Sequence, residues 1–342
     1  MAHRAAGTDG GRPGLAATEG MTTARRSFDA RLFVARYGTA LGGLAVFLFF
    51  VAAAPNFSNA ANLVNILKQV SFLVIFGVGF TLALTTSELD LSFANLASLA
   101  AVATGGLVHT GAPIPLAVAA GISIGLVGGL ANGLAVTVIK VPSLIATLGT
   151  ASIANGFAFW MTEGVAFVGR WDPSFVGIGR GATFGVPNLI LWSAAAALLA
   201  LFLLKKTRTG IHMVATGEAD EAARLSGIAV RRMKVIGLTL SGLAAGVAAV
   251  LLTANLSSAA PTMAGDYLLN AIAAVLLGMT MFEPGRPNIP GTVTGALVIG
   301  MLSNGLILMG AAYYVQDIVL GVIIILSVAV SASALKKAAF AV

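Results

Sequence analysis

The sequence predicts an all-α integral membrane protein with about ten transmembrane helices, and three observations carry that prediction. Hydrophobic residues make up 58% of the 342 residues and charged residues only 10%, whereas a soluble protein carries roughly 25% charged residues. The apolar residues are grouped into segments of about 17–25 residues, the length with which an α-helix crosses a bilayer. The short alternating segments typical of transmembrane β-strands are missing. Helices are therefore the structure that satisfies the backbone in lipid.

Composition also excludes several kinds of site. The chain has no cysteine, so neither disulfides nor thiolate metal sites can form, and we expect no metal site. It has no Gly-Lys dipeptide and no His-Glu-x-x-His, so it lacks a phosphate-binding P-loop and that zinc motif. We therefore expect no enzymatic activity and no cofactor in this chain. The net charge of +7 is explained by membrane topology rather than by nucleic acid.

The first 31 residues are polar, Gly-rich and basic, without an apolar run, and we expect a disordered cytoplasmic tail over 1–31. Arg25-Arg26 resembles a twin-arginine signal. The next apolar segment is a full span, however, which favours a positively charged anchor on the cytoplasmic side. The sequence leaves open whether Met21 is the true start.

Apolar segments divide the remaining chain, from 32 to 335, into one transmembrane domain. Asn56–Gln69 is amphipathic, and we expect it to lie on the outer membrane surface. The eighth segment is short for a crossing, so the sequence leaves open whether it crosses fully. A short cytoplasmic tail is expected over 336–342. The ten expected spans cover residues 33–54, 70–86, 91–108, 116–139, 143–162, 188–204, 235–254, 268–282, 291–310 and 315–334.

Basic residues orient these spans, because they remain with the negative cytoplasmic leaflet. With both termini in the cytoplasm, only Lys68, Arg170 and Arg180 of the 20 Lys and Arg residues lie outside. The other 17 (20 − 3) lie inside. Moving one span would scatter them, so this distribution supports the ten-span topology.

The polar segment Lys205–Lys234 separates two of the expected spans. Its ends are basic and its middle is acidic, which places it at the cytoplasmic surface. The run from Gly217 to Gly227 is rich in Glu and Ala, which favours a short helix with Gly227 as its C-cap. An ordinary solvated loop is the alternative. The candidate residues for coupling to a partner are Glu218, Asp220, Glu221, Ala222, Ala223 and Gly227.

The motif Glu221-Ala222-Ala223-x-x-x-Gly227 resembles the EAA---G loop of ABC importer permeases, whose short helix docks on an ATPase subunit. The sequence from TRTG through GEADEAARLSGI to LSGLAAG is similar to the ribose/xylose/autoinducer-type sugar permeases, within the branched-chain amino acid/sugar permease family. Further blocks at 89–92, 141–150 and 271–278 agree in order. The resemblance covers most of residues 62–335.

This resemblance implies a multi-pass permease subunit of an ABC importer in the bacterial inner membrane, for a monosaccharide or a similar small polar solute. Its implied partners are ATPase subunits that bind the ATP, an extracytoplasmic solute-binding protein and a second permease copy, homodimeric or heterodimeric. Membrane lipid surrounds it and nucleic acid is no partner. A branched-chain amino-acid permease and a stand-alone ion-coupled transporter remain alternatives. A membrane-embedded prenyl transferase would need clustered Asp residues, which are missing.

Polar side chains within or between spans are candidates for the solute path. Asp90 precedes a span, where its carboxylate can cap the helix with help from Ser92. The family usually has Gly-Gly-Ile-Asp-Leu-Ser here, so the extra acid Glu88 is a departure. Amides can bind sugar hydroxyls or tie helices together, and both readings stay open. The candidate path residues are Glu88, Asp90, Ser92, Asn95, Asn132, Asn155, Asn270 and Asn304.

Two further patterns concern the same spans. Spans 2–3, with an acidic turn at Glu88, resemble spans 8–9, with an acidic turn at Glu283, which indicates an internal repeat of the kind found in transporters. Aromatic side chains could stack on the apolar face of a sugar, although a core or lipid-facing role is commoner. These aromatic residues are Phe72, Phe76, Phe93, Phe157, Phe159 and Trp160.

Overall fold

The computed structural model describes residues 30–339, with side chains described for 41–312 and 314–327. The tail expected over 1–31 lies outside the described residues except for its last two, which open the first helix. Of the tail expected over 336–342, residues 336–339 continue the last helix, and 340–342 lie outside.

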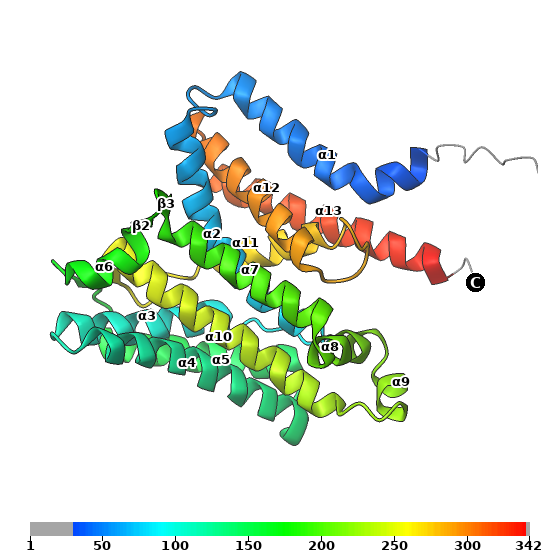
Figure 1. Ribbon diagram of the computed structural model, residues 1–342, viewed down its shortest axis with the longest axis horizontal. Helices are drawn as coiled ribbons and strands as arrows, with labels where there is room; N and C mark the ends of the chain where they lie inside the picture. Colours follow the sequence, from blue (N-terminus) through cyan, green and yellow to red (C-terminus); the bar gives the residue numbers. More distant parts are fainter. Residues whose placement is uncertain (1–29, 340–342) are drawn as a thin grey trace, which may run out of the picture.

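Long apolar helices form the body of the molecule, arranged as a bundle (Figure 1). α4 continues without a break as the π-helical segment η1, Ala135–Ile139. The helices are α1 Ala30–Ala53, α2 Ala60–Leu84, α3 Phe93–His109, α4 Ile114–Leu134, α5 Ser143–Thr162, α7 Asn188–Lys206, α10 Val230–Leu256, α11 Tyr267–Gly278, α12 Ile289–Leu308 and α13 Tyr313–Ala339.

Six helices in the described part of the chain are long and apolar enough to cross a membrane: α2, α4 with η1, α5, α7, α10 and α12. Four shorter apolar helical stretches accompany them, at Leu41–Ala53, Phe93–His109, Tyr267–Gly278 and Tyr314–Ser327. The predicted all-α membrane fold is confirmed at this level. The count of ten crossings stays a prediction, and the eighth expected span, α11, is the shortest helix among them.

The segment Asn56–Gln69, expected on the outer surface, runs into the second helix. Residues 60–69 do not form a separate surface helix but the first part of α2. Asn59 caps this helix by accepting a hydrogen bond from the Ala61 N–H. Ile66 is buried together with Val70, which follows four residues later. The predicted apolar face is thus divided, because Leu67 is exposed. That this segment lies at the outer membrane surface stays a prediction.

Short elements fold the segment between α5 and α7. α6 spans Pro173–Arg180 and is capped by Asp172, whose pKa is lowered by hydrogen bonds from Ser174. β2 (Ala182–Thr183) pairs with β3 (Val186–Pro187). β1 (Phe167–Val168) pairs antiparallel with β4 (Ser258–Ala259), which fastens this segment to the end of α10.

Glycines allow α4 and α10 to pack with their backbones in contact. Gly121, Gly125, Gly129 and Gly133 recur every four residues on the buried face of α4. A Cβ on Gly125 would collide with the carbonyl oxygen of Gly242 in α10. Small residues permit this approach where helices associate in lipid.

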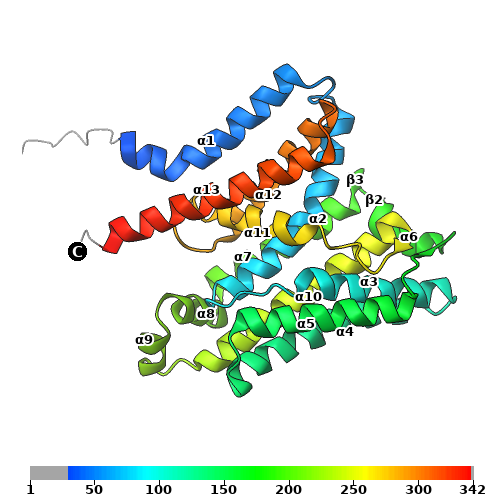
Figure 2. The same ribbon diagram turned by 180° about the vertical axis from the view of Figure 1, so that it is seen from behind.

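The segment between α7 and α10 folds into two short helices, α8 (Arg208–Glu218) and α9 (Asp220–Leu225). α1 begins and α13 ends at the same end of the molecule as α8 and α9, on the right in Figure 1 and on the left in Figure 2. This arrangement agrees with termini and polar segment sharing one side of a membrane. That the shared side is cytoplasmic stays a prediction.

Candidate functional site

The coupling segment, residues 205–234, differs in one detail from the short helix expected over 217–227. The chain breaks at Ala219, so Gly217 and Glu218 end α8, while α9 begins at Asp220. The end of α9 is as predicted. Gly227 has φ +80°, its N–H donates to the Arg224 carbonyl, and the Ile228 N–H donates to the Ala223 carbonyl. This is a Schellman motif, in which glycine adopts the left-handed conformation after the helix.

The face of α9 away from the bundle is exposed. The Glu221 and Arg224 side chains pair with each other and are 73% and 67% exposed, and Leu225 is 83% exposed. Ala222 is exposed too, while Ala223 is buried. The motif therefore holds α9 to the bundle through Ala223 and presents its other residues outward.

The turn Thr85–Ser92, which joins α2 to α3, lies directly beneath the coupling segment. Ser87 has φ +60°, in the left-handed region that favours glycine, and its hydroxyl donates a 2.8 Å hydrogen bond to the Gly217 carbonyl. The next residue, Glu88, pairs at 2.9 Å with Lys234, which also pairs at 2.7 Å with Asp220. The acid that departs from the family pattern thus anchors α9 and the start of α10.

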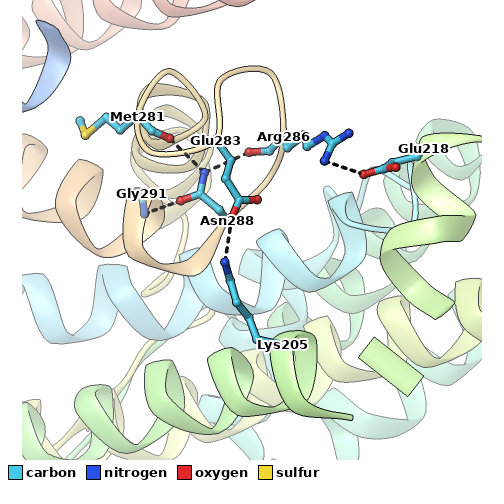
Figure 3. A network of polar contacts seen from close by, with 7 residues as sticks. All are labelled: Lys205, Glu218, Met281, Glu283, Arg286, Asn288 and Gly291. Carbon is cyan, nitrogen blue, oxygen red and sulfur yellow. Dashed lines mark hydrogen bonds and ion pairs between the residues drawn. The ribbon is translucent and has the colours of Figure 1, made fainter. Parts of the chain in front are cut away.

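The turn Met279–Asn288, which joins α11 to α12, holds the other side of the coupling segment (Figure 3). Glu283 pairs at 2.7 Å with Lys205 at the end of α7. Arg286 pairs at 3.0 Å with Glu218 at the end of α8. Asn288 fixes the turn from inside, because its amide donates to the Met281 and Arg286 carbonyls while its Oδ1 accepts from the Gly291 N–H.

The two turns share features beyond the sequence pattern that indicated a repeat. Phe282, like Ser87, has a left-handed φ, of +57°. Each of these residues precedes a glutamate, and each glutamate pairs with a lysine at one end of the coupling segment. The two turns therefore clamp the coupling segment in matching ways.

A cavity of about 800 Å³ lies between the two turns and the end of α8, within the ~300–1,000 Å³ range of ligand clefts. Its polar and charged lining residues include Thr85, Ser87, Glu218, Glu283 and Arg286. The cavity is therefore bounded by the same residues that hold the coupling segment.

Three of the candidate path residues, Asp90, Ser92 and Asn132, meet in a chain of hydrogen bonds that ends at Thr150, which is not among the candidates predicted from the sequence. Asp90 accepts from the Ser92 N–H at 2.9 Å and from its hydroxyl at 2.6 Å. The Asn132 amide of α4 donates to the Ser92 oxygen at 2.7 Å, and the Thr150 hydroxyl of α5 donates to Asn132 Oδ1 at 2.6 Å. Burial raises the pKa of Asp90, although the hydrogen bonds from Ser92 oppose the shift. Asp90 Oδ2 and the Ser241 hydroxyl of α10 are buried without a hydrogen-bond partner among the described residues.

The remaining amides divide into two groups. Asn304 exchanges hydrogen bonds with Asn62, at 3.1 and 2.9 Å, and so ties α12 to α2. Asn270 donates to the Asp266 carbonyl one helical turn away. Asn95 and Asn155 are half-buried, and their amides make no hydrogen bond with the residues that the structure describes. That these two line the solute path stays a prediction.

The aromatic candidates also divide. Phe72, Phe76 and Phe93 are buried; Phe76 contacts both Phe93 and Tyr267, and Phe72 contacts Tyr267. They form a core cluster joining α2, α3 and α11. Phe157, Phe159 and Trp160 are 51%, 42% and 76% exposed on α5.

Sequence reasoning treated the basic partners in these ion pairs only as topology markers. Lys205, Lys234 and Arg286 each contact an acid far away in the chain, so no local spacing could indicate the pairing. The signal available in the sequence was that each of the two turns contains a glutamate and each end of the coupling segment contains a lysine. Among the described residues, no group of three His, Asp or Glu side chains is placed to hold a metal.

Known proteins resemble this chain over nearly its whole length. The sequence profile of the family described as "Branched-chain amino acid transport system / permease component" matches residues 62–328. The chain belongs to this permease family. It is therefore a membrane protein of the ABC permease type.

Individual relatives carry more specific names. The ribose import permease protein RbsC of Escherichia coli strain K12 is 36% identical over 90% of this chain and 97% of its own length. RbsC of Bacillus subtilis strain 168 is 34% identical over 91% of this chain and 97% of its own. The L-arabinose transport system permease protein AraH of Escherichia coli strain K12 is 31% identical over 91% and 94%. No solved structure matches the chain.

Proposed function

We propose that this permease is the membrane-spanning subunit of a bacterial inner-membrane ABC importer for a monosaccharide. The observation that carries the proposal is the 36% identity to a ribose import permease over 90% of this chain, together with the arabinose permease at 31%. The amides of Asn95 and Asn155 suit a polyhydroxylated solute, because each can donate to and accept from hydroxyl groups.

The energy for import comes from ATP bound by a separate subunit, which docks on α9. The exposed face of α9, with Glu221 and Leu225, is the contact surface. When the ATPase subunits close, they displace the coupling segment, and the two turns that clamp it open or close the cavity between them. The solute path thereby switches between its outward and inward openings.

Two further partners complete the importer. A soluble binding protein delivers the solute at the opposite end of the bundle, where α6 and the paired strands β1 and β4 lie. A second permease copy forms the other half of the membrane part. α4, α5 and α7 each expose most of their apolar surface in the single chain, so these faces are available both to lipid and to a second copy.

Uptake by cells that lack their own pentose importers tests the substrate class. The permease is expressed with the ATPase and binding protein of its own system, and uptake of labelled D-ribose, L-arabinose and L-leucine is measured. Import of a pentose and not of leucine supports the proposal. Import of leucine alone would instead establish an amino-acid permease.

The energy source is tested in liposomes that contain the permease with or without its ATPase. We expect ATP-dependent import only with the ATPase present. Import by the permease alone, driven by an ion gradient, would contradict the ABC mechanism.

The docking site is tested by substitution. Glu221→Arg should abolish association with the ATPase. Glu163→Arg changes an exposed residue at the opposite end of the bundle; it serves as the matched control and should leave the association unchanged.

A further inference from the structure

The turn Thr85–Ser92 contacts two different parts of the molecule with successive residues. Its first half faces the coupling segment: Ser87 donates to the Gly217 carbonyl at 2.8 Å, and Glu88 pairs with Lys234 at 2.9 Å. The glycine at 217 allows a very close approach, because a Cβ there would collide with the Thr85 carbonyl oxygen. A displacement of the end of α8 therefore cannot bypass this turn.

The second half of the turn faces α5. The Leu89 N–H donates to the Ser143 hydroxyl at 3.3 Å, and the Thr147 hydroxyl donates to the Leu89 carbonyl at 3.3 Å. Both partners lie in the first turns of α5. Successive residues of one short turn thus touch the coupling segment on one side and α5 on the other.

A second connection between the turn and α5 passes through buried residues. From Asp90 the chain of hydrogen bonds passes through Ser92 and Asn132 to Thr150 in the middle of α5. Asp90, Ser92 and Asn132 are 0% exposed, so water does not compete for these bonds. Each is 2.6–2.7 Å long, and breaking any one would leave a buried polar group unsatisfied.

Apart from these hydrogen bonds, α5 packs mainly against α3, with a narrow buried face that includes Ala151, Ala154 and Ala158. Only 28% of the apolar 18-residue stretch of α5 is buried within the chain. Its exposed residues include Ser152, and a Cβ on Gly149 or Gly156 would meet open space. α5 also carries Asn155, one of the two candidate path amides without a hydrogen bond among the described residues.

We propose that the turn Thr85–Ser92 transmits the displacement of the coupling segment to α5 through the Asp90–Ser92–Asn132–Thr150 chain, and that Asn132 and Thr150 are positioning residues for transport. The inference rests on the proposed function, because it takes residues 205–234 to be where the ATPase acts. It assigns the moving, solute-facing part of the pathway to α5.

Two single-cysteine probes test the inference, and the chain has no native cysteine to interfere. The assembled complex with its ATPase is placed in liposomes, and an environment-sensitive fluorophore is attached at Ile211→Cys on α8 or at Ser152→Cys on α5. Both sites are exposed. Ser152 lies two residues beyond Thr150, hence on roughly the opposite face of the helix. Each spectral change on addition of ATP is compared with and without Thr150→Val, which removes the hydroxyl at nearly constant volume.

We expect ATP to change both signals in the parent protein. In Thr150→Val the Ile211 signal should persist, while the Ser152 signal and the solute imported per ATP fall roughly three- to tenfold, the factor that loss of one buried hydrogen bond implies. Thr150→Ser should restore both. Thr104→Val is the matched control, because the Thr104 hydroxyl is buried but bonds only to the Ala100 carbonyl of its own helix; it should change neither signal.

Ser87→Ala breaks the connection at its exposed end and provides a second test should Thr150→Val fail to fold. It too should reduce the Ser152 signal while the Ile211 signal persists. An undiminished Ser152 signal in either folded variant would overturn the inference. Absence of an ATP response at Ile211 in the parent complex would instead contradict the proposed docking of the ATPase.

Discussion

Lys234 forms an ion pair with Glu88 across 2.9 Å, at a position where the Glu88 side chain is only 8% exposed. The same ammonium group pairs with Asp220 at 2.7 Å. One cation thus joins the start of α10 to both the turn beneath the coupling segment and the first residue of α9. The turn at Glu88 is thereby joined to the neighbouring elements α9 and α10, more than 120 residues later in the chain, through a single charge.

Lys234→Gln should lower the free energy of unfolding by about 2–3 kcal/mol, because it leaves the Glu88 carboxylate buried and unpaired. This is below the ~3–5 kcal/mol for a fully buried pair, since Lys234 is 19% exposed. Arg224→Gln should cost less than about 1 kcal/mol, because its pair with Glu221 lies in water. Thermal unfolding in detergent compares the two. Equal losses of stability in the two variants would show that the Lys234 ion pairs stabilise the protein no more than the exposed Glu221–Arg224 pair does.

Gly217→Ala should separate α8 from the turn Thr85–Ser92, because the new Cβ would meet the Thr85 carbonyl. We expect a loss of about 1–3 kcal/mol, as for overpacked positions, and a loss of sugar uptake. Gly149→Ala is the control, since a Cβ there meets open space. Uptake per molecule of protein, measured beside thermal unfolding, checks both effects. Normal uptake by Gly217→Ala would mean that this contact can open without consequence.

Asn62 and Asn304 exchange hydrogen bonds between α2 and α12. Asn304→Leu should destabilise the protein by about 1–2 kcal/mol, because the partner amide loses its bonds. The double replacement with Asn62→Leu should recover part of this loss, since neither amide is then left unsatisfied, although the Phe57 carbonyl loses its hydrogen bond from Asn62. The melting temperatures of the two single variants and of the double variant measure this recovery. Additive losses would contradict a direct pair.

Asn95→Leu should lower the rate of sugar uptake without lowering stability, because the Asn95 amide makes no hydrogen bond within the described part of the chain. A path residue makes weak contacts, so capture of the sugar by the binding protein should not change. Uptake kinetics and thermal unfolding are measured together, with Asn304→Leu as the structural comparison. Unchanged uptake would remove Asn95 from the path.

Membrane-impermeant thiol reagents test the orientation. Leu225→Cys, on the exposed tip of α9, should be protected in intact cells and should react after permeabilisation. Phe184→Cys, fully exposed between β2 and β3, should react in both. Expression without the ATPase removes shielding of α9. Thr216 is unsuitable for such labelling because it is buried. Labelling of Leu225→Cys in intact cells would reverse the orientation.

Periodicity and length predicted most of the fold. The expected span 143–162 coincides with α5, and 188–204 differs from α7 only at its end. The environment of Asn56–Gln69 could not be predicted in the same way. An amphipathic face can turn toward a membrane surface or toward other helices, and the pattern alone does not distinguish them. The pairing of Asn62 with Asn304 in α12, 242 residues away, shows that part of this segment packs against another helix.

The site was predictable only in part. The turn in which Asp90 accepts from the Ser92 N–H and the left-handed Gly227 follow from local rules. The expected cap of α3 is not formed, because Ser92 stands at the N-cap without a side-chain capping hydrogen bond. The Asn132–Thr150 bond joins two helices across a connection that includes η1, and no local pattern fixes which amide meets which hydroxyl. The ion pairs of the two turns likewise depend on tertiary packing.

The backbone contact between α4 and α10 limits how this protein can diversify. Gly125 faces the Gly242 carbonyl, and Gly129 faces that of Leu238, so no larger residue fits at either glycine. These two helices can therefore neither slide nor be reshaped by ordinary substitution. Changes that adapt the permease to another solute must instead arise where side chains have room, and α5 is where the chain offers it. Recognition of the solute can therefore change in evolution while the contact between α4 and α10 stays the same.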